Sequence, residues 1–184
     1  MTSNQPIRYW HSSDVLFEHF DENFLQVENH HAAPYGFCFA RKHETAQEHA
    51  PGKKYLYEVE LSASEGEWFR FDQRLCATDK GKQLHAKIVA QAVFPIAADP
   101  TCREVYNKLV INLGDDLKAV DFLKPLGYRG AVYRSQGTVA LYAFWNMPNI
   151  RIISVHHANA WDPAQSTQPP QSWLQRLGFW LYTR

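Results

Sequence analysis

Alternating apolar and polar residues predict strands at both ends of this chain. In residues 54–61, tyrosine, valine and leucine at every second position alternate with two glutamates and a leucine, the two-residue period of a half-buried strand. A similar alternation or a short apolar run predicts six further strands, at residues 7–11, 37–40, 68–72, 130–134, 138–145 and 150–156. The stretch 68–72 also fits a loop that covers a cleft.

The middle of the chain repeats its apolar residues every three to four positions, which predicts helices. A short helix precedes the break at Pro51-Gly52 and three longer helices follow it; the four lie at residues 43–50, 79–94, 101–113 and 116–124. Gly114 ends the third helix, and Asp115 starts the fourth. Because strands precede and follow this helical block, the order favours an α+β domain over an alternating βαβ fold.

Composition and charge narrow the class of protein. The 184 residues suffice for one domain with an apolar core. Lys plus Arg and Asp plus Glu both number 19, without a long run of one sign, which argues against a protein that mainly coats nucleic acid or anionic membrane. No secretory signal or membrane-length apolar run is visible, so we expect a cytoplasmic protein without a membrane span. Cys38, Cys76 and Cys102 lack metal-ligand spacing, which predicts reduced thiols and no metal site.

The end of the chain predicts a linker and a helix after a first domain of residues 1–160. Residues 161–171 are rich in Pro, Gln, Ser and Thr, as a linker is. Residues 172–184 predict an amphipathic helix with a tryptophan and three leucines on one face, Trp173, Leu174, Leu177 and Leu181. Either this helix docks on its own domain, or it mediates association with a partner or an interface.

Four landmarks follow one another in the first third of the chain. The first strand ends in a histidine, His11, which two serines follow, Ser12-Ser13. A glycine-containing apolar run comes next, at residues 35–40. A small-residue helix at residues 45–50 and the alternating strand at residues 54–61 complete the series. This order resembles the histidine-led branch of the ADP-ribosyltransferase fold. That branch includes the poly- and mono-ADP-ribose polymerases, diphtheria-type toxins and short phage-encoded relatives, anti-CRISPR ADP-ribosyltransferases among them.

The resemblance implies an α+β domain with two short, split β-sheets around an NAD cleft and a helical middle segment. His11 stands at the family histidine, which holds the ribose hydroxyls of NAD, and Ser12-Ser13 at its Gly-Ser/Thr. Further along, residues 126–133 resemble the family's Gly-Tyr-Asp-Gly turn and strand, and residues 139–153 its last strand pair. The NAD-binding residues implied in this way are His11, Ser12, Ser13, Tyr35, Gly36, Phe37, Cys38, Phe39 and His49.

Each of these side chains also has a structural interpretation. Tyr35, Phe37 and Phe39 could offer an aromatic face to the nicotinamide, but alternation indicates that the two phenylalanines also fit the core. Cys38 stands where the family has a tyrosine, and it fits a buried, inert thiol or a nucleophile. His49 stands where the family has a second tyrosine that stacks on the nicotinamide, but it also fits an exposed helix residue.

The expected catalytic positions are His11, Leu141 and Asp72. Leu141 precedes Tyr142, where the family usually carries its catalytic glutamate. Asp72 is a substitute for charge stabilisation or a turn residue, and His11 alone would fit a histidine that caps the loop after its strand. Cleavage of the nicotinamide–ribose bond needs no general acid, because the leaving group is already a cation.

The resemblance therefore implies a mono-ADP-ribosyltransferase that transfers ADP-ribose from NAD to a macromolecular target, in phage–host conflict by analogy. The target would be a protein or a nucleic acid, and NAD would be a substrate, with no metal. Mono-ADP-ribosylating members often carry an aliphatic residue at the glutamate position. The alternative is a catalytically inactive ADP-ribosyltransferase-like domain that binds a protein or a nucleotide.

Overall fold

The computed structural model describes residues 7–21, 35–135 and 139–158. These residues contain seven strands: β1 (Arg8–Ser13), β2 (Phe37–Ala40), β3 (Tyr55–Leu61), β4 (Trp68–Arg70), β5 (Gly130–Ser135), β6 (Val139–Phe144) and β7 (Ile150–His157). They also contain four helices: α2 (His43–His49), α3 (Asp79–Ala90), α4 (Cys102–Leu113) and α5 (Asp116–Leu123). The α+β class and the order of strands, helices and strands are thus confirmed. The linker 161–171 and the helix 172–184 lie outside the described residues.

The strands form a single sheet in the order β4-β5-β6-β2-β1-β3-β7. Only β4 and β5 are parallel, and every other pair is antiparallel. The prediction of two separate sheets is therefore wrong as stated, but the sheet has a narrow point. Strand β1 pairs with β2 through one residue pair, Trp10 with Ala40, whereas it pairs with β3 along its whole length. We call this narrow point the β1–β2 junction.

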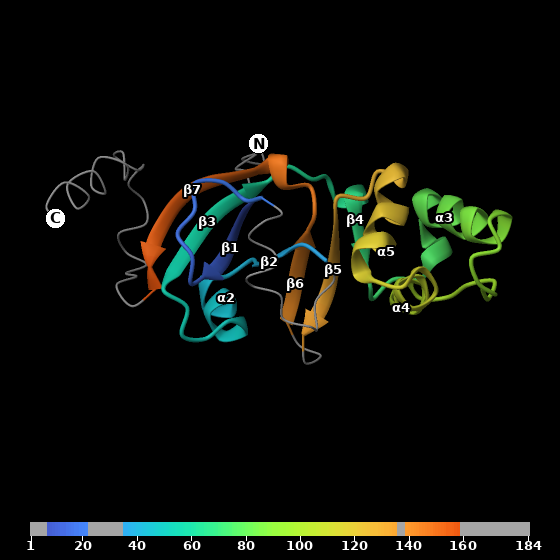
Figure 1. Ribbon diagram of the computed structural model, residues 1–184, viewed down its shortest axis with the longest axis horizontal. Helices are drawn as coiled ribbons and strands as arrows, with labels where there is room; N and C mark the ends of the chain where they lie inside the picture. The colour runs from blue at the N-terminus through green and yellow to red at the C-terminus, as the bar shows by residue number, and fades with distance from the viewer. Residues whose placement is uncertain (1–6, 22–34, 136–138, 159–184) are drawn as a thin grey trace, which may run out of the picture.

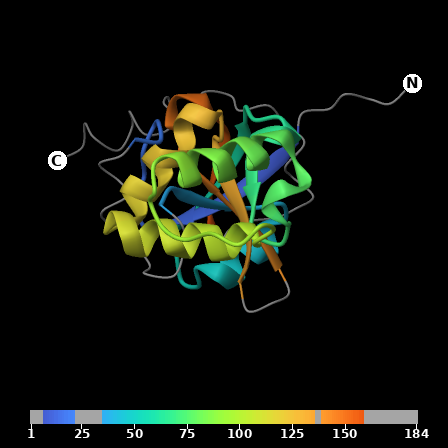
Figure 2. The ribbon, with the colours of Figure 1, turned by 90° about the vertical axis from the view of Figure 1, so that its right-hand side faces the viewer.

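The helices all lie on the same face of this sheet, which we call the helix face. Its strand residues include Trp10 of β1, Ala40 of β2, Tyr133 of β5 and Leu141 of β6, which share an apolar cluster with residues of α2–α5. Helices α3–α5 gather beside β4 and β5, and α2 packs against β1 (Figure 1). Viewed from the helical end of the molecule, after a 90° turn, α3 and α4 stand in front of the strands (Figure 2).

The opposite face carries a second apolar cluster that is dominated by aromatic side chains, and we call it the aromatic face. Tyr9 of β1, Phe37 of β2, Tyr57 of β3 and Phe144 of β6 belong to it, and all are buried. Instead of a helix, the segment that follows β1 covers this face through Phe17 and Phe20. The sheet is therefore buried on both faces along β1 and β2.

Two helix boundaries follow directly from capping residues. A capping box starts α4, in which the Thr101 hydroxyl accepts from the Glu104 amide and the Glu104 carboxylate accepts from the Thr101 amide. Gly114 then ends α4 with a positive φ of 103°, which glycine adopts without a steric penalty. Helix α3 ends at Ala90 rather than at residue 94, because the chain turns at Ala92, whose φ is also positive.

The first strand is longer than the sequence pattern predicts. Ser12 and Ser13 continue β1 instead of forming a loop, because they stay in register with Leu56 and Tyr55 of β3. His11 therefore lies inside the strand, and its neighbours Trp10 and Ser12 both point to the face opposite to its own. The predicted strand at residues 68–72 is shorter than expected and pairs with β5 over three residues.

Candidate functional site

His11 lies on the aromatic face at the β1–β2 junction, with 6% of its surface exposed. Its Nδ1 is 2.8 Å from the Cys38 carbonyl oxygen of β2. A carbonyl oxygen only accepts, so Nδ1 carries the proton, and Nε2 is the acceptor nitrogen of the neutral ring. This hydrogen bond ties β1 to β2 beside the only residue pair that joins them.

Five aromatic rings surround the His11 imidazole, and we call them the aromatic cage. Their centroids lie 5.4 to 6.4 Å from that of His11. The cage residues are Phe17, Phe20, Phe37, Phe39 and Tyr57. Because Phe37 and Phe39 are 2% and 1% exposed, they belong to the core rather than to a free stacking surface.

Hydrogen bonds hold in place the segment after β1 that carries Phe17 and Phe20. The Tyr57 hydroxyl accepts from the Phe17 amide at 2.8 Å and donates to the Val15 carbonyl at 3.0 Å. The Phe17 and Tyr57 rings stack at a centroid distance of 4.4 Å. Ser13, on the same face, donates to the Val15 carbonyl at 3.0 Å and accepts from the Val15 amide at 2.9 Å. The hydroxyls of Ser13 and Tyr57 thus both stabilise the chain that covers His11.

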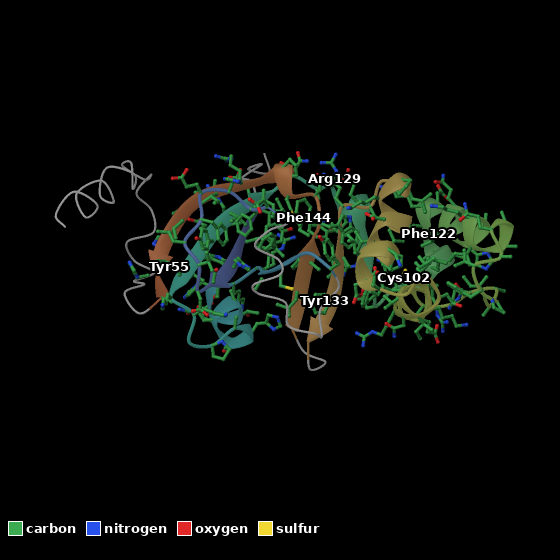
Figure 3. The ribbon with its side chains drawn as sticks, in the orientation of Figure 1. Tyr55, Cys102, Phe122, Arg129, Tyr133 and Phe144 are labelled. Atoms are coloured by element: carbon green, nitrogen blue, oxygen red, sulfur yellow. The ribbon has the colours of Figure 1, made fainter. Side chains whose placement is uncertain are left out.

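Leu141 lies on the other side of the sheet from His11. In the register of the strands, Trp10 pairs with Ala40 and Ala40 with Leu141, and this row is on the helix face. Leu141 is 2% exposed and lies opposite Tyr133 (labelled in Figure 3). The structure thus does not bring together the two positions that the resemblance pairs as catalytic.

Cys38 faces the same side as Leu141. Its thiol lies 3.1 Å from the Tyr133 hydroxyl, within hydrogen-bonding distance. Burial raises the pKa of Tyr133 above its ordinary value, and the neighbouring Cys38 adds to this rise. The phenol therefore stays protonated at neutral pH, and Cys38 is partly buried rather than sealed in the core.

Ser12 points to the helix face, opposite in direction to Ser13. Only 5% of its surface is exposed, and its hydroxyl oxygen has no hydrogen-bond partner. Its strand neighbour on β3 is the fully buried Leu56, which shares an apolar cluster with Ala46 of α2. Two adjacent serines of one motif thus have opposite hydrogen-bonding states.

The remaining predicted site residues are dispersed. Tyr35 packs partly buried between the two clusters, and Gly36 is required structurally, since a Cβ there would lie 2.7 Å from the Phe144 carbonyl oxygen. His49 is exposed at the end of α2. Asp72 is exposed, pairs with Arg70 at 3.6 Å and borders a cavity of about 40 Å³, which has room for little more than water.

A polar network that the sequence did not indicate covers the helix face of β1, β3 and β7. Ser154 donates to the Glu58 carboxylate at 2.8 Å, and its oxygen lies 2.8 Å from His156 Nε2. Arg8 forms ion pairs with Glu58 and Glu60 at 3.8 and 3.5 Å. The network could not be found from the sequence, because residues about one hundred positions apart meet only through the β3–β7 register.

Trp10 borders this network. Its ring lies 6.2 Å from that of His156 and 5.7 Å from that of His43. Burial lowers the pKa of His156, an effect that the nearby Glu58 opposes. His156 is thus half-buried within the network, whereas its neighbour His157 is exposed.

A second cavity, of about 300 Å³, lies at the far end of the sheet. Its walls include Trp68 and Arg70 of β4, Thr78 and Lys80 at the start of α3, and Tyr128. Burial raises the pKa of Tyr128 to about 12. Because β4 and β1 are separated by three strands in the sheet order, this cavity is distinct from the β1–β2 junction.

Comparisons with protein-family models, with curated proteins and with solved structures found no match. Within the described residues, no three histidine, cysteine or acidic side chains come together in a way that would hold a metal ion. None of the helices described is long and apolar enough to cross a membrane.

Proposed function

We propose that this chain is an NAD-dependent mono-ADP-ribosyltransferase whose nicotinamide site lies at the β1–β2 junction. One observation carries this proposal: the sheet narrows to one residue pair between the strand with His11-Ser12-Ser13 and the strand with residues 37–40. The two motifs that the resemblance assigns to NAD thus lie side by side where the fewest residue pairs join neighbouring strands of the sheet.

The chemistry of the junction is compatible with this assignment. Cleavage of the nicotinamide–ribose bond requires fixed ribose hydroxyls and tolerance of positive charge at the anomeric carbon. The Cys38 carbonyl fixes the tautomer of His11, which makes Nε2 the nitrogen that can accept from a hydroxyl. On the other face of the sheet, the Cys38 thiol lies within hydrogen-bonding distance of the Tyr133 hydroxyl.

The acceptor must then provide the carboxylate or nucleophilic group that β6 lacks. Leu141 offers no carboxylate to stabilise the anomeric carbon or to deprotonate a nucleophile. We therefore expect slow hydrolysis of NAD by water and faster transfer to an acceptor that brings an acidic or strongly nucleophilic group. Incubating the protein with labelled NAD, alone and with a cell lysate, measures both rates.

Calorimetry of NAD binding to the parent protein and to the variants His11→Asn and His11→Ala tests the site. An asparagine amide can donate close to the place of Nδ1, so His11→Asn keeps the bond to Cys38 but removes Nε2. We expect His11→Asn to stay folded and to bind NAD at least about tenfold more weakly. His11→Ala also loses the hydrogen bond to the Cys38 carbonyl and should therefore lower the Tm. A parent protein that binds no NAD would refute the proposal.

A second candidate function is nucleotide binding without turnover. The burial of Leu141 between Ala40 and Tyr133 favours it, because this arrangement fits a packed core better than a catalytic carboxylate site. A protein of this kind would bind NAD or ADP-ribose in calorimetry. It would release no nicotinamide and label no protein or nucleic acid in the lysate.

A further inference from the structure

The cavity of about 300 Å³ beside β4 is the larger of the two cavities described above, and the proposed function does not use it. It lies between this edge strand of the sheet and the start of α3, so that β5 and β6 separate it from the β1–β2 junction. Proteins usually bind small molecules in concave sites where a few polar groups converge. The side chains of its walls therefore indicate which ligand the cavity suits.

Two cations line this cavity, Arg70 from β4 and Lys80 from α3. Lys80 is half-buried, and its Nζ donates to the Gly127 carbonyl at 3.0 Å. Within the described part of the chain, Lys80 forms no ion pair with a carboxylate. An ammonium group that donates to one neutral acceptor keeps further N–H donors. The charge of Lys80 is thus available to an anion in the cavity.

The acidic side chains around the cavity point toward solvent. The Arg70 Nη1 donates to the Glu65 carboxylate at 2.8 Å, but the Glu65 side chain is 74% exposed. Asp79 is 91% exposed and pairs with Lys82 at 3.1 Å. The Arg70 Nε is buried and makes no hydrogen bond, since Asp72 is 3.6 Å away. An ion pair as exposed as that of Arg70 with Glu65 contributes little to stability, so a stronger anion can replace Glu65.

Neutral hydrogen-bonding groups complete the wall. Tyr128 is 5% exposed and packs against Phe69 with 5.2 Å between the ring centroids. Burial raises the pKa of Tyr128 to about 12, so its hydroxyl stays protonated at neutral pH and can donate. Burial likewise raises the pKa of Cys102 (labelled in Figure 3) to about 12, so its thiol is neutral. The cavity therefore combines two cations with neutral donors and an aromatic wall.

These groups favour a ligand with more than one negative charge. A monocarboxylate would gain nothing over Glu65 at Arg70, because Glu65 belongs to the same chain and has a high effective concentration there. A phosphate monoester carries a charge of about −1.5 to −2 at neutral pH and three acceptor oxygens. It can accept from Arg70 and Lys80 together, and the cavity has room for the organic group that carries the phosphate.

We propose that the cavity between β4 and the start of α3 is a binding site for a phosphate monoester, which Arg70 and Lys80 hold and for which Glu65 is the internal competitor. The phosphate belongs either to a free small molecule or to a phosphorylated protein side chain. NAD carries no phosphate monoester, and its proposed site lies two strands away. The two proposals can therefore fail separately.

Calorimetry with phenyl phosphate, phenyl sulfate and a peptide that carries one phosphotyrosine tests this site in the full chain. Phenyl sulfate has a similar shape but a single charge, so we expect it to bind at least about tenfold more weakly than phenyl phosphate. Tighter binding of the peptide than of phenyl phosphate assigns the phosphate to a protein side chain, and the reverse assigns it to a free ester. The proposal is wrong if neither phosphate compound binds, or if phenyl sulfate binds as well as phenyl phosphate.

Three variants then locate the binding. Lys80→Gln should bind phenyl phosphate about tenfold more weakly, because a charge-assisted hydrogen bond is lost. Glu65→Gln should bind it about threefold more tightly, because the competing carboxylate is gone. Lys82→Gln removes the same charge as Lys80→Gln from an exposed position on α3, so it is the matched control and should bind like the parent.

Thermal melts of the same variants separate recognition from stability. If Lys80→Gln lowers the Tm but binds phenyl phosphate like the parent, Lys80 serves only to hold the turn at Gly127, and the proposal is overturned. The affinity for NAD should be the same in Lys80→Gln, Glu65→Gln and the parent. A parent that binds phenyl phosphate but no NAD would refute the proposed function and leave this site standing.

Discussion

The two faces of β1 differ in how completely their polar groups are satisfied. On the aromatic face, Ser13 and the His11 Nδ1 have hydrogen-bond partners, and the chain that covers them is tied down by Tyr57. Four buried side-chain polar atoms in the described part of the chain lack a hydrogen-bond partner. Three of them lie on the helix face of β1 and β3: Arg8 Nη1, Ser12 Oγ and Glu60 Oε1.

This difference suggests a division of roles between the faces. The aromatic face combines close ring packing with satisfied hydrogen bonds, which stabilises the fold. On the helix face, Arg8, Ser12 and Glu60 keep hydrogen-bonding atoms without a hydrogen-bond partner, although Arg8 is ion-paired with Glu58 and Glu60.

The largest expected effect comes from placing a charge on the helix face at β6. Leu141→Glu would bury a carboxylate without a cation beside Ala40 and Tyr133, at a position 2% exposed. We expect the free energy of unfolding to fall by about 3–5 kcal/mol in urea denaturation. Leu141→Met keeps the apolar volume and should cost less than about 1.5 kcal/mol.

The opposite result would change the comparison between the faces. If Leu141→Glu folds like the parent and raises NAD hydrolysis about tenfold or more, the residue lines an open site rather than the core. The NAD site on the helix face would then extend along β6 as well as along β1.

An intermediate effect is expected on the aromatic face. Tyr57→Phe keeps the stacked ring but leaves the Phe17 amide without its partner and the Val15 carbonyl with Ser13 as its remaining donor. We expect a loss of about 2 kcal/mol in the free energy of unfolding. Tyr55→Phe, at a half-buried position on the same strand and face (Figure 3), should change it by no more than about 0.5 kcal/mol. Equal losses in the two variants would show that the hydrogen bonds of Tyr57 contribute no more to stability than the hydroxyl of Tyr55.

The smallest effect concerns the polar network on the helix face. Burial lowers the pKa of His156 in the folded state, so the unfolded chain binds a proton first as the pH falls. Stability should therefore be flat above a pH of about 6.5, the ordinary histidine pKa, and should decrease below it. Glu58 and Ser154 face this imidazole directly, and His43 lies across Trp10.

Thermal melts between pH 7.5 and 5.5 measure this dependence in the parent and in His156→Gln. The variant cannot take up the proton, so its Tm should vary less over this range. A parent with the same pH profile as His156→Gln would mean that the network does not resist protonation of His156.

Local signals in the sequence predict much of the fold. The stop at Gly114, the start at Asp115 and the alternation in residues 54–61 are encoded within a few positions, and each appears in the structure. Such signals do not fix strand ends that depend on pairing. Strand β1 extends beyond its apolar run because β3 stays in register with Ser12 and Ser13.

The candidate site was harder to predict than the fold. The motif around His11 was visible, but the alternation of β1 places this residue and Leu141 on opposite faces through pairings with two other strands. The cage residue Phe17 and the network residue His156 reach the junction only through tertiary contacts. The unsatisfied state of Ser12 depends on three-dimensional surroundings that no local pattern records.

The single parallel pair of the sheet has a consequence for how this protein folds. Strands β4 and β5 are parallel, so the chain between them, residues 71–129, must cross over before they can pair, and that crossover contains α3, α4 and α5. Strands β5 and β6 instead pair antiparallel, and only three residues separate them in the sequence. We therefore expect β5 and β6 to pair early, whereas β4 adds only when the helices have closed their long loop. The helical segment and one edge of the sheet would then form and unfold as a single cooperative unit, kinetically separate from the junction.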